Sequence, residues 1–382
     1  MERDTVTSKT TFLKFWISSL NPDQTLNGFG HEADETYFSL TDDTEGEYVN
    51  HYYFTDFLKQ MFENFTPGIK IQDTSGKEVE TDVLLYETLK FVVEQVMSIG
   101  GKHLNIQDVD LVIALPITCN NKVTRFVETY ALKAGIRKDG LSIVSNGVAQ
   151  YADEDDWDRN LAGSFQEKSI YFSVRFGDEQ TTINKHMKYR KGIDPVIKST
   201  TFPVGSHSIL SDILSFLKDG LGTDVIEEFK SDSPEEYKST IDEFMSNIMN
   251  FRMVICVPHP LKSITRREWK DDISNVLKNR IIDGSITESN CKMKMTEERI
   301  HRLCKSTFEK MMKKIVVVME QEWPGNVKRL FMSGELANSK FFKAFLRGKM
   351  LKCSICIPKN APLVVLKGSV YYEHVDSTQC SG

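Results

Sequence analysis

The chain has 382 residues, 40% of them hydrophobic and 27% charged, so it is long enough for two substantial lobes with their own cores. Its 48 lysines and arginines against 54 aspartates and glutamates give a net charge of −6, which leaves no surplus of cations for phosphates and argues against nucleic-acid binding. There is no apolar leader, no membrane-length apolar run and no paired cysteine framework among seven scattered cysteines. We therefore expect a cytoplasmic protein with reduced thiols that neither crosses nor binds a membrane.

The N-terminal third predicts strands followed by helices. Residues 11–40 alternate apolar and polar positions around Asn21-Pro22-Asp23, as the strands of a hairpin do. Residues 51–63 and 82–98 have apolar residues at helical spacing.

Residues 109–144 predict a βαβ unit. The apolar run 109–115 is stopped by Pro116, and an amphipathic helix follows in which either Asn120 or Asn121 caps the first turn and Gly135 ends the last. A second apolar run at 141–144 completes the unit. Parallel strands joined by a helix indicate an α/β fold with a right-handed crossover and a sheet covered on both faces.

The remainder of the chain begins with an acidic run at 153–156, which we interpret as a solvated excursion at the boundary between two lobes. Beyond it, residues 169–175 and 180–187 predict a β-hairpin, 207–219 and 234–248 predict helices, and 252–257 predicts a strand. A long helix from Thr296 to about Glu322 precedes a strand at 328–332. Cys353 and Cys356 have the spacing of a redox or half-zinc motif, but without a second pair they are better read as part of a short strand. Five methionines are read as core filling: Met293, Met295, Met311, Met312 and Met319.

The order of these segments resembles the ATPase domain of the seventy-kilodalton heat-shock proteins, within the actin-like ATPase superfamily. The resemblance is carried by residues 112–116, the helix ending at 131–136 and Ala149-Gln150-Tyr151. It continues in Gly28-Phe29-Gly30-His31-Glu32-Ala33, in residues 330–339 and in residues 364–370. It is closest to the divergent branch of that family known as members 12A and 12B, and it runs from about residue 10 to the end.

The resemblance implies an α/β, two-lobed, ribonuclease H-like fold. Lobe I spans 1–160 and lacks the N-terminal part that carries the first phosphate hairpin, since only ten residues precede Thr11. Lobe II spans 161–382, with a helical insert at about 207–300 and closing C-terminal strands. It also implies a stress-response chaperone that binds ATP or ADP with magnesium. The client-binding domain of longer relatives is missing from the sequence, so any protein partner, of unknown identity, is expected to dock on the lobes.

The second phosphate turn of the family departs from its pattern at residues 174–182. Arg175 or its neighbour takes the place of the metal-facing aspartate, and two glycines of the pattern are absent. Asp178 and Glu179 put negative charge where phosphate would lie. Like charges at such a distance cost on the order of several kcal/mol in a partly buried cleft. The general base is lost as well, because Ser145 and Asn146 stand where the family has a glutamate and cannot deprotonate water as a carboxylate does.

No metal ligand is assigned, and Lys59 is a candidate remnant of the catalytic lysine, although a lysine on such a helix is more often a solvated side chain. The positions that match the nucleotide contacts of the family are Gly177, Thr181, Gly205, Ser206, Ser333, Gly334, Ser339, Lys367 and Gly368. Glycines after strands are also needed for structure alone.

Two hypotheses follow. The favoured one is a pseudo-ATPase, a degenerate heat-shock-type domain that has lost hydrolysis and works as a chaperone-like or scaffolding module. The other is an ATP-binding, weakly hydrolysing chaperone of the 12A and 12B type whose N-terminal ATP loop is encoded by an exon missing from this sequence. A sugar-kinase-like enzyme of the same superfamily would also need the lost phosphate turns.

Overall fold

The computed structural model describes residues 18–42, 47–55, 57–63, 65–66, 68–100, 105–116, 119–145, 168–187, 196–249, 254–281, 283–289, 291–322, 329–347 and 353–369. The chain divides into two compact units, Met1–Ser145 and Asn146–Gly382. The acidic run at 153–156, the expected lobe boundary near residue 160 and the residues before 18 lie outside the described residues. The lobe limits therefore stay predictions.

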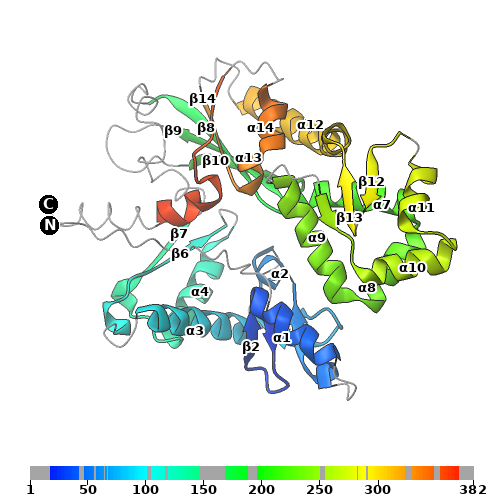
Figure 1. The fold of residues 1–382 in the computed structure, drawn as a ribbon. Helices are drawn as coiled ribbons and strands as arrows, with labels where there is room; N and C mark the ends of the chain where they lie inside the picture. Colours follow the sequence, from blue (N-terminus) through cyan, green and yellow to red (C-terminus); the bar gives the residue numbers. More distant parts are fainter. Residues whose placement is uncertain are drawn as a thin grey trace, which may run out of the picture. The chain divides into compact units, whose positions relative to one another are not determined.

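The first unit contains a three-stranded antiparallel sheet in the order β2-β1-β3, a β4–β5 hairpin and a parallel pair, β6–β7 (Figure 1). Its strands are β1 Ser18–Leu20, β2 Leu26–Phe29, β3 Tyr52–Phe54, β4 Lys70–Gln72, β5 Glu78–Glu80, β6 Leu111–Leu115 and β7 Leu141–Ser145. Its helices are α1 His31–Asp42, α2 Phe57–Glu63, α3 Thr81–Gly100 and α4 Asn121–Lys133, with short 3-10 turns at Glu47–Asn50, Ile106–Asp108 and Lys138–Gly140.

Two sequence expectations in this unit are wrong in part. The hairpin around residues 21–23 is present as β1 and β2, but residues 31–42 form helix α1 where alternation predicts strands. Acidic residues in the first turn, Glu32 and Asp34, favour a helix there because they face the positive end of its dipole. Residues 52–54, expected as helix, form strand β3, since the consecutive aromatic residues pack well on a pleated surface.

The predicted βαβ unit is confirmed. Strands β6 and β7 pair in parallel from Leu111 opposite Leu141 to Leu115 opposite Ser145, with α4 between them in sequence. Asn120 is the capping residue, because its side-chain oxygen accepts hydrogen bonds from the backbone N–H groups of Lys122 and Val123, at 2.9 and 3.2 Å. The chain leaves α4 through Gly135, whose φ of 97° favours glycine.

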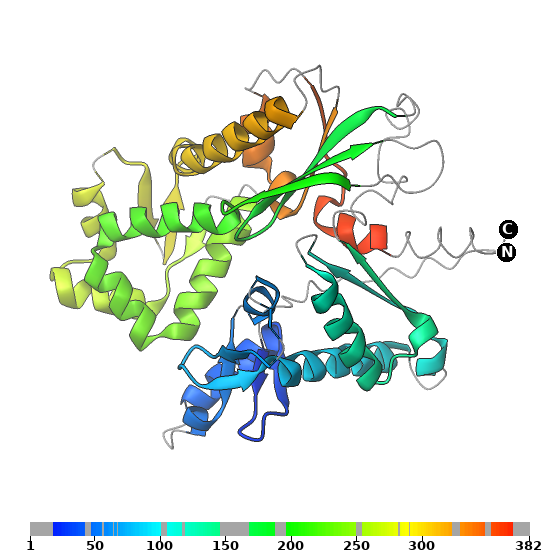
Figure 2. The same cartoon turned by 180° about the vertical axis from the view of Figure 1, so that it is seen from behind.

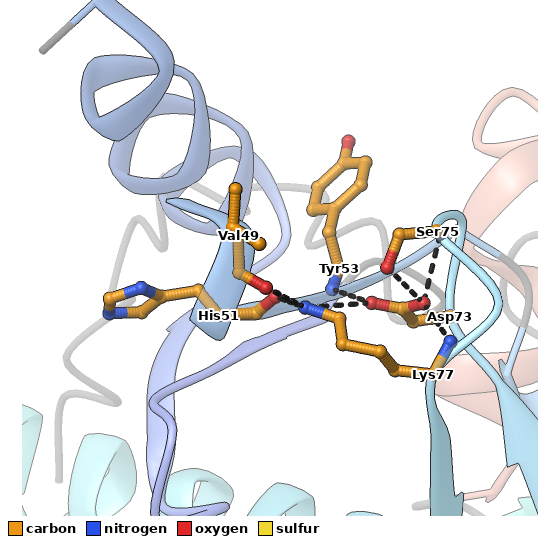
Figure 3. A network of polar contacts seen from close by, with 6 residues as sticks. All are labelled: Val49, His51, Tyr53, Asp73, Ser75 and Lys77. Carbon is orange, nitrogen blue, oxygen red and sulfur yellow. Dashed lines mark hydrogen bonds and ion pairs between the residues drawn. The ribbon is translucent and has the colours of Figure 1, made fainter. Parts of the chain in front are cut away.

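A buried carboxylate ties the β4–β5 hairpin to β3, and Figure 3 shows its network of Val49, His51, Tyr53, Asp73, Ser75 and Lys77. The Asp73 side chain accepts hydrogen bonds from the Ser75 backbone at 2.9 Å, the Ser75 hydroxyl at 2.7 Å and the Lys77 backbone at 2.8 Å. The Lys77 ammonium lies 3.6 Å from the same carboxylate. A charge that is buried with this many donors is stabilised by them, so the hairpin turn is fixed in place.

Lys77 also reaches away from its own hairpin. Its ammonium donates to the backbone carbonyl of Val49 at 2.9 Å and to that of His51 (Figure 3). It also lies over the ring of Tyr52, 4.7 Å from the ring centre. These hydrogen bonds join the segment before β3 to a hairpin more than twenty residues later, so the Lys77 ammonium holds two segments of the first unit together.

The second unit is built on a five-stranded sheet in the order β10-β9-β8-β14-β15 (Figures 1 and 2). Its strands are β8 Ile170–Phe176, β9 Thr181–Met187, β10 Val196–Phe202, β14 Arg329–Ser333 and β15 Ser354–Cys356. The three strands β8, β14 and β15 run parallel, while β9 and β10 are antiparallel to their neighbours. The predicted β8–β9 hairpin and the strand at 328–332 are confirmed, and β10 adds a strand that the pattern did not predict.

Helices surround this sheet and continue into an α/β insert. They are α7 Ser206–Leu221, α8 Thr223–Asp232, α9 Pro234–Met249, α10 His259–Trp269, α11 Ile273–Arg280, α12 Glu297–Glu322, α13 Glu335–Asn338 and α14 Lys340–Arg347. A second antiparallel sheet, β11-β13-β12, consists of β11 Val254–Cys256, β12 Ile286–Ser289 and β13 Lys292–Met295. The predicted helices at 207–219, 234–248 and 296–322 correspond to α7, α9 and α12. Thr296 caps α12 as predicted, accepting from the Arg299 backbone at 3.2 Å.

The two faces of the large sheet pack on different partners. One face, with Phe172, Val174 and Phe176, joins the main core with α7, α12 and α14, and the five methionines named above are all buried in that core. The other face places Tyr171, Phe331 and Cys356 against Val364. The expectation of a short strand at Cys353–Cys356 is confirmed by β15, in which Cys356 is buried as a small hydrophobic side chain. Among the described helices, none is both long and apolar enough to span a membrane.

Candidate functional site

Several of the predicted nucleotide contacts gather where the parallel strands of the second unit end. Ser333, the last residue of β14, lies opposite Arg175 near the end of β8, and the β8–β9 turn follows directly at residues 177–180. The carboxyl ends of parallel strands are where α/β folds bind their ligands. We therefore take this edge as the candidate site.

The β8–β9 turn closes on itself and carries two carboxylates at its tip. The backbone N–H of Gly177 donates to the carbonyl of Gln180 at 2.9 Å. A Cβ on Gly177 would lie 2.9 Å from that same carbonyl oxygen, so the tight turn requires glycine here. Between these two residues stand Asp178 and Glu179, where a phosphate-binding turn would present glycines.

Both carboxylates bond to the first residues of α7. The Ser206 hydroxyl donates to the Asp178 carboxylate at 2.8 Å, and the ring nitrogen Nδ1 of His207 lies 2.5 Å from the Glu179 carboxylate. The negative charges therefore lie at the positive end of the α7 dipole, a position that favours an anion. The protein fills this position with its own side chains.

The backbone of α7 is bonded to the same turn. The N–H of Ser206 donates to the Gly177 carbonyl at 3.1 Å and the N–H of His207 to the Asp178 carbonyl at 2.9 Å. Gly205 permits this approach, since a Cβ there would lie 2.1 Å from the Asp178 carbonyl oxygen. Two N–H groups at the start of the helix that could otherwise hold an anion are thus satisfied within the protein.

Thr181 is also used internally. Its hydroxyl donates to the Val204 carbonyl at 2.7 Å, which fixes the segment between β10 and α7 to the start of β9. Gly177, Thr181, Gly205 and Ser206 therefore lie close together, and the contacts that they make are within the protein, with nearby backbone groups and, for Ser206, with the Asp178 carboxylate.

Arg175 takes the place that the resemblance gives to a metal-facing aspartate. Burial lowers the pKa of its guanidinium, and the charge of Asp178 partly offsets that effect. Arginine keeps its proton in proteins, so the end of β8 presents a cation where a magnesium ion would need a carboxylate. Among the described residues, no cluster of three or more histidine, cysteine, aspartate or glutamate side chains could hold a metal ion.

Gly334 brings the end of β14 against the end of β8. Its φ is 95°, its N–H donates to the Ala361 carbonyl at 3.0 Å, and a Cβ would lie 2.1 Å from the Phe176 carbonyl oxygen. The hydroxyl of the buried Ser333 lies 3.4 Å from the Val174 carbonyl. This glycine turn therefore lies at the candidate edge, as the resemblance implies.

The remaining predicted residues lie farther along the chain. Ser339 is fully buried between α13 and α14, where its carbonyl accepts from the Lys343 backbone at 3.0 Å. Lys367 and Gly368 belong to a helical stretch, residues 364–369, that follows β15 and a 3-10 turn at Ala361–Leu363. Lys59 is on α2 and Ser145 ends β7, so both belong to the first unit.

Sequence reasoning identified the charges of Asp178 and Glu179 but missed what they bind. The pairs Asp178–Ser206 and Glu179–His207 are each 28 residues apart in the chain, and no local pattern links them. The sequence around His207 did not predict its contact with Glu179. That contact depends on the close approach at Gly205, which brings the start of α7 to the turn.

Comparison with known proteins supports the fold. No protein-family profile and no curated protein matches the sequence. The crystal structure of MreB5 of Spiroplasma citri bound to AMPPNP is similar over 96% of this chain and 90% of that one, with a TM-score of 0.55 and 14% identity. The ADP-bound form of the same protein aligns over the same shares with a TM-score of 0.49 and 11% identity. The AMPPNP-bound structure confirms the predicted actin-like fold class.

Proposed function

We propose that the chain is a degenerate nucleotide-binding domain of the actin-like fold, a pseudo-ATPase in which hydrolysis is lost or very weak. It would act in the cytoplasm as a chaperone-like or scaffolding module that binds other proteins. The resemblance to the 12A and 12B branch of the heat-shock family supports a chaperone-like role, and the retained architecture supports a binding role that does not need turnover.

The observation that carries this proposal is the bonding of the β8–β9 turn to α7. Asp178 and Glu179 put two negative charges at its tip, and Ser206 and His207 bond to both carboxylates and to two turn carbonyls. A triphosphate at this turn would meet like charge in a partly enclosed site and would have to displace these contacts. Repulsion of this kind costs on the order of several kcal/mol, enough to remove useful affinity.

The catalytic groups are also unsuited to hydrolysis. Arg175 replaces the carboxylate that would face a metal ion, and Ser145 stands where a general base is expected. A hydroxyl with an ordinary acidity cannot take a proton from water as a carboxylate does. Both changes, like the two carboxylates of the β8–β9 turn, argue against ATP hydrolysis.

Isothermal titration calorimetry of the full chain with MgATP, together with a phosphate-release assay, tests the proposal. We expect no binding at ATP concentrations up to about 1 mM, equivalent to less than ~4 kcal/mol of binding free energy, and no phosphate release above the uncatalysed rate. Micromolar binding accompanied by turnover would reject the pseudo-ATPase.

A variant with Asp178→Gly and Glu179→Gly provides the matched comparison. Removing both charges and both side chains should restore weak ATP affinity if the carboxylates are the main obstacle, whereas Asp178→Asn with Glu179→Gln removes only the charge. A response of the glycine variant alone would assign the obstacle to backbone access, and a response of both variants would assign it to charge. Binding by the unmodified chain equal to that of the variants would contradict the proposal.

The second candidate is an ATP-binding, weakly hydrolysing chaperone. The specific observation in its favour is the fold shared with MreB5, which was crystallised with AMPPNP. The chain also has glycine turns at Gly205 and Gly334, where two backbone segments approach closely, as a nucleotide-binding edge would have. This candidate predicts ATP affinity in the unmodified chain, and the same titration separates it from the pseudo-ATPase.

A further inference from the structure

One charged side chain near the end of β8 lacks a direct counter-ion. Arg175 alternates along the strand with Val174 and Phe176, which are buried in the main core, so it lies on the opposite face of the sheet. Its side chain is only partly exposed, and among the described residues its guanidinium forms no hydrogen bond and no ion pair. Asp178 acts on it through its charge alone.

The space beside this guanidinium is open. A Cβ on Gly177 would lie 3.9 Å from the Nη1 atom of Arg175, so the guanidinium lies next to the bare backbone of the β8–β9 turn. Apart from the chain neighbours of Gly177, only that atom and the Gln180 carbonyl oxygen lie within 4 Å of this position. We call the position of this absent side chain the Gly177 gap.

A second polar side chain flanks the Gly177 gap. Gln180 is hydrogen-bonded to Gly177 across the turn, and Thr182 lies opposite Arg175 on β9, so the register places Gln180 and Thr182 on the same face as Arg175. Gln180 is partly exposed, and none of the described residues bonds to its side-chain amide. A cation and an amide donor therefore lie on either side of a position that holds no side chain.

The two carboxylates of the turn are held away from this face. Asp178 accepts from Ser206, and Glu179 lies against His207, both at the start of α7. Helix α7 packs in the main core, on the face of the sheet opposite Arg175. The end of the sheet therefore has negative charge on the α7 side and positive charge on the other, where an approaching anion meets Arg175 first.

Stability alone does not explain an arginine at this position. Removing a guanidinium from water without giving its N–H groups new partners is unfavourable. Methionine or leucine would fill a similar space without that cost. Arg347 on α14 has no ion pair among the described residues either, but it is exposed, so water solvates its charge. An anionic ligand would supply the partner that Arg175 lacks.

We propose that Arg175 is the anion-binding residue of a site for a small carboxylate ligand at the Gly177 gap. The planar guanidinium can hold both oxygens of a carboxylate with two parallel hydrogen bonds, and the Gln180 amide can donate a third. The carboxyl ends of β8 and β14 meet at this edge, which is where α/β sheets bind ligands. The proposal does not depend on whether the chain hydrolyses ATP, so it goes beyond the pseudo-ATPase.

Phosphate fits this cation less well than a carboxylate does. One arginine balances one negative charge, and the charge of Asp178 already acts on Arg175. A phosphate group carries more than one negative charge at neutral pH, so Asp178 and Glu179 repel it more strongly than they repel a carboxylate. The ligand class is therefore a monocarboxylate.

NMR titration of the full, ¹⁵N-labelled chain with sodium acetate at pH 7 tests the proposal, with sodium chloride keeping the ionic strength constant. We expect the Nε–H signal of Arg175, identified by its absence in Arg175→Lys, to shift in a saturable way. The dissociation constant should be about 1–10 mM, since so small a ligand makes few contacts. The Gly177 backbone amide should shift over the same concentrations, and it provides the readout in variants without Arg175.

Two substitutions at the site make the test specific. Arg175→Gln should abolish the acetate-dependent shift of the Gly177 amide. If that variant fails to fold, as judged by circular dichroism, Gln180→Glu replaces it, because a carboxylate on the other side of the gap pairs with Arg175 and should weaken acetate binding at least about tenfold.

Arg347→Gln is the matched control, since it removes one exposed arginine and changes the net charge as Arg175→Gln does. Acetate binding should stay within about twofold in this variant, and inorganic phosphate should bind the unmodified chain at least about threefold more weakly than acetate. The proposal is overturned by the absence of a saturable shift, by equal loss in the Arg175 and Arg347 variants, or by tighter binding of phosphate. Calorimetry with MgATP reports on the pseudo-ATPase alone, so the two proposals fail separately.

Discussion

At the scale of single residues, glycines decide how closely the turn and the helix of the candidate site approach each other. Gly205 has φ of −139° and ψ of −164°, an extended conformation that any residue can adopt. Glycine is therefore required here only because there is no room for a Cβ. The virtual Cβ lies 2.1 Å from one backbone oxygen and 2.5 Å from another, and backbone cannot move aside as a flexible side chain can. The sequence predicted a glycine turn at this point but not the contact that demands it.

We predict that Gly205→Ala separates the β8–β9 turn from the start of α7. The added methyl group must push the two backbones apart, which should lower the free energy of unfolding by roughly 1–3 kcal/mol, measured by urea denaturation. Gly284→Ala is the control, because its φ of 64° carries a conformational cost of about 1–2 kcal/mol while its Cβ meets nothing within 4 Å. Faster hydrogen exchange at the Ser206 and His207 amides should occur only in the first variant. Unchanged exchange there would show that the contact is not needed.

At the scale of elements, periodicity predicted those whose patterns are long and regular. The βαβ unit, α7, α9 and α12 were found because their apolar faces repeat over many residues. Thr296 gave the start of α12, and either Asn120 or Asn121 was expected to start α4, where the structure has Asn120 as the cap. Many of the segments that were missed are short, although α1 with twelve residues and β10 with seven were missed as well. Strands β4, β5, β12 and β13 have three or four residues each, too few for alternation to be distinguished from chance.

The packing of α4 on α3 should depend on alkaline pH through Tyr130. Its hydroxyl donates to the Asp82 carboxylate at 2.9 Å, and burial together with that hydrogen bond raises the pKa of Tyr130 to about 12. Because the pKa is higher in the folded than in the unfolded chain, this contribution to stability is complete below about pH 10 and is lost as the pH rises through 12. We expect the free energy of unfolding to decrease over that interval.

The Tyr130→Phe variant isolates this contribution from the other groups that titrate at high pH. It should be less stable than the unmodified chain at pH 8, and the difference should shrink between about pH 10 and 12, as followed by urea denaturation. A difference that stays constant across the interval would show that Tyr130 does not titrate differently in the two states.

At the scale of the whole molecule, the fold was easier to predict than the site. The order of strands and helices over most of the chain indicated the actin-like class, which depends on many residues and survives at 14% identity to MreB5. The chemistry of the site depends on few residues whose partners are distant in sequence. Asp178 and Glu179 could be recognised as wrong for phosphate, but the bonds from Ser206 and His207 could not be anticipated without the tertiary structure.

Thermal unfolding of the whole chain gives a measure of ligand binding that does not depend on the heat of binding. A ligand that binds only the folded state at 100 times its dissociation constant adds about 2.7 kcal/mol to the stability, which raises the melting temperature visibly. We predict no change with MgATP at about 1 mM, because the carboxylates of the β8–β9 turn repel its phosphates. Magnesium chloride alone is the control for general ionic effects. A dose-dependent rise with MgATP beyond that control would mean that the nucleotide site is functional despite its two carboxylates, and the chain would then have to be regarded as an ATP-binding protein.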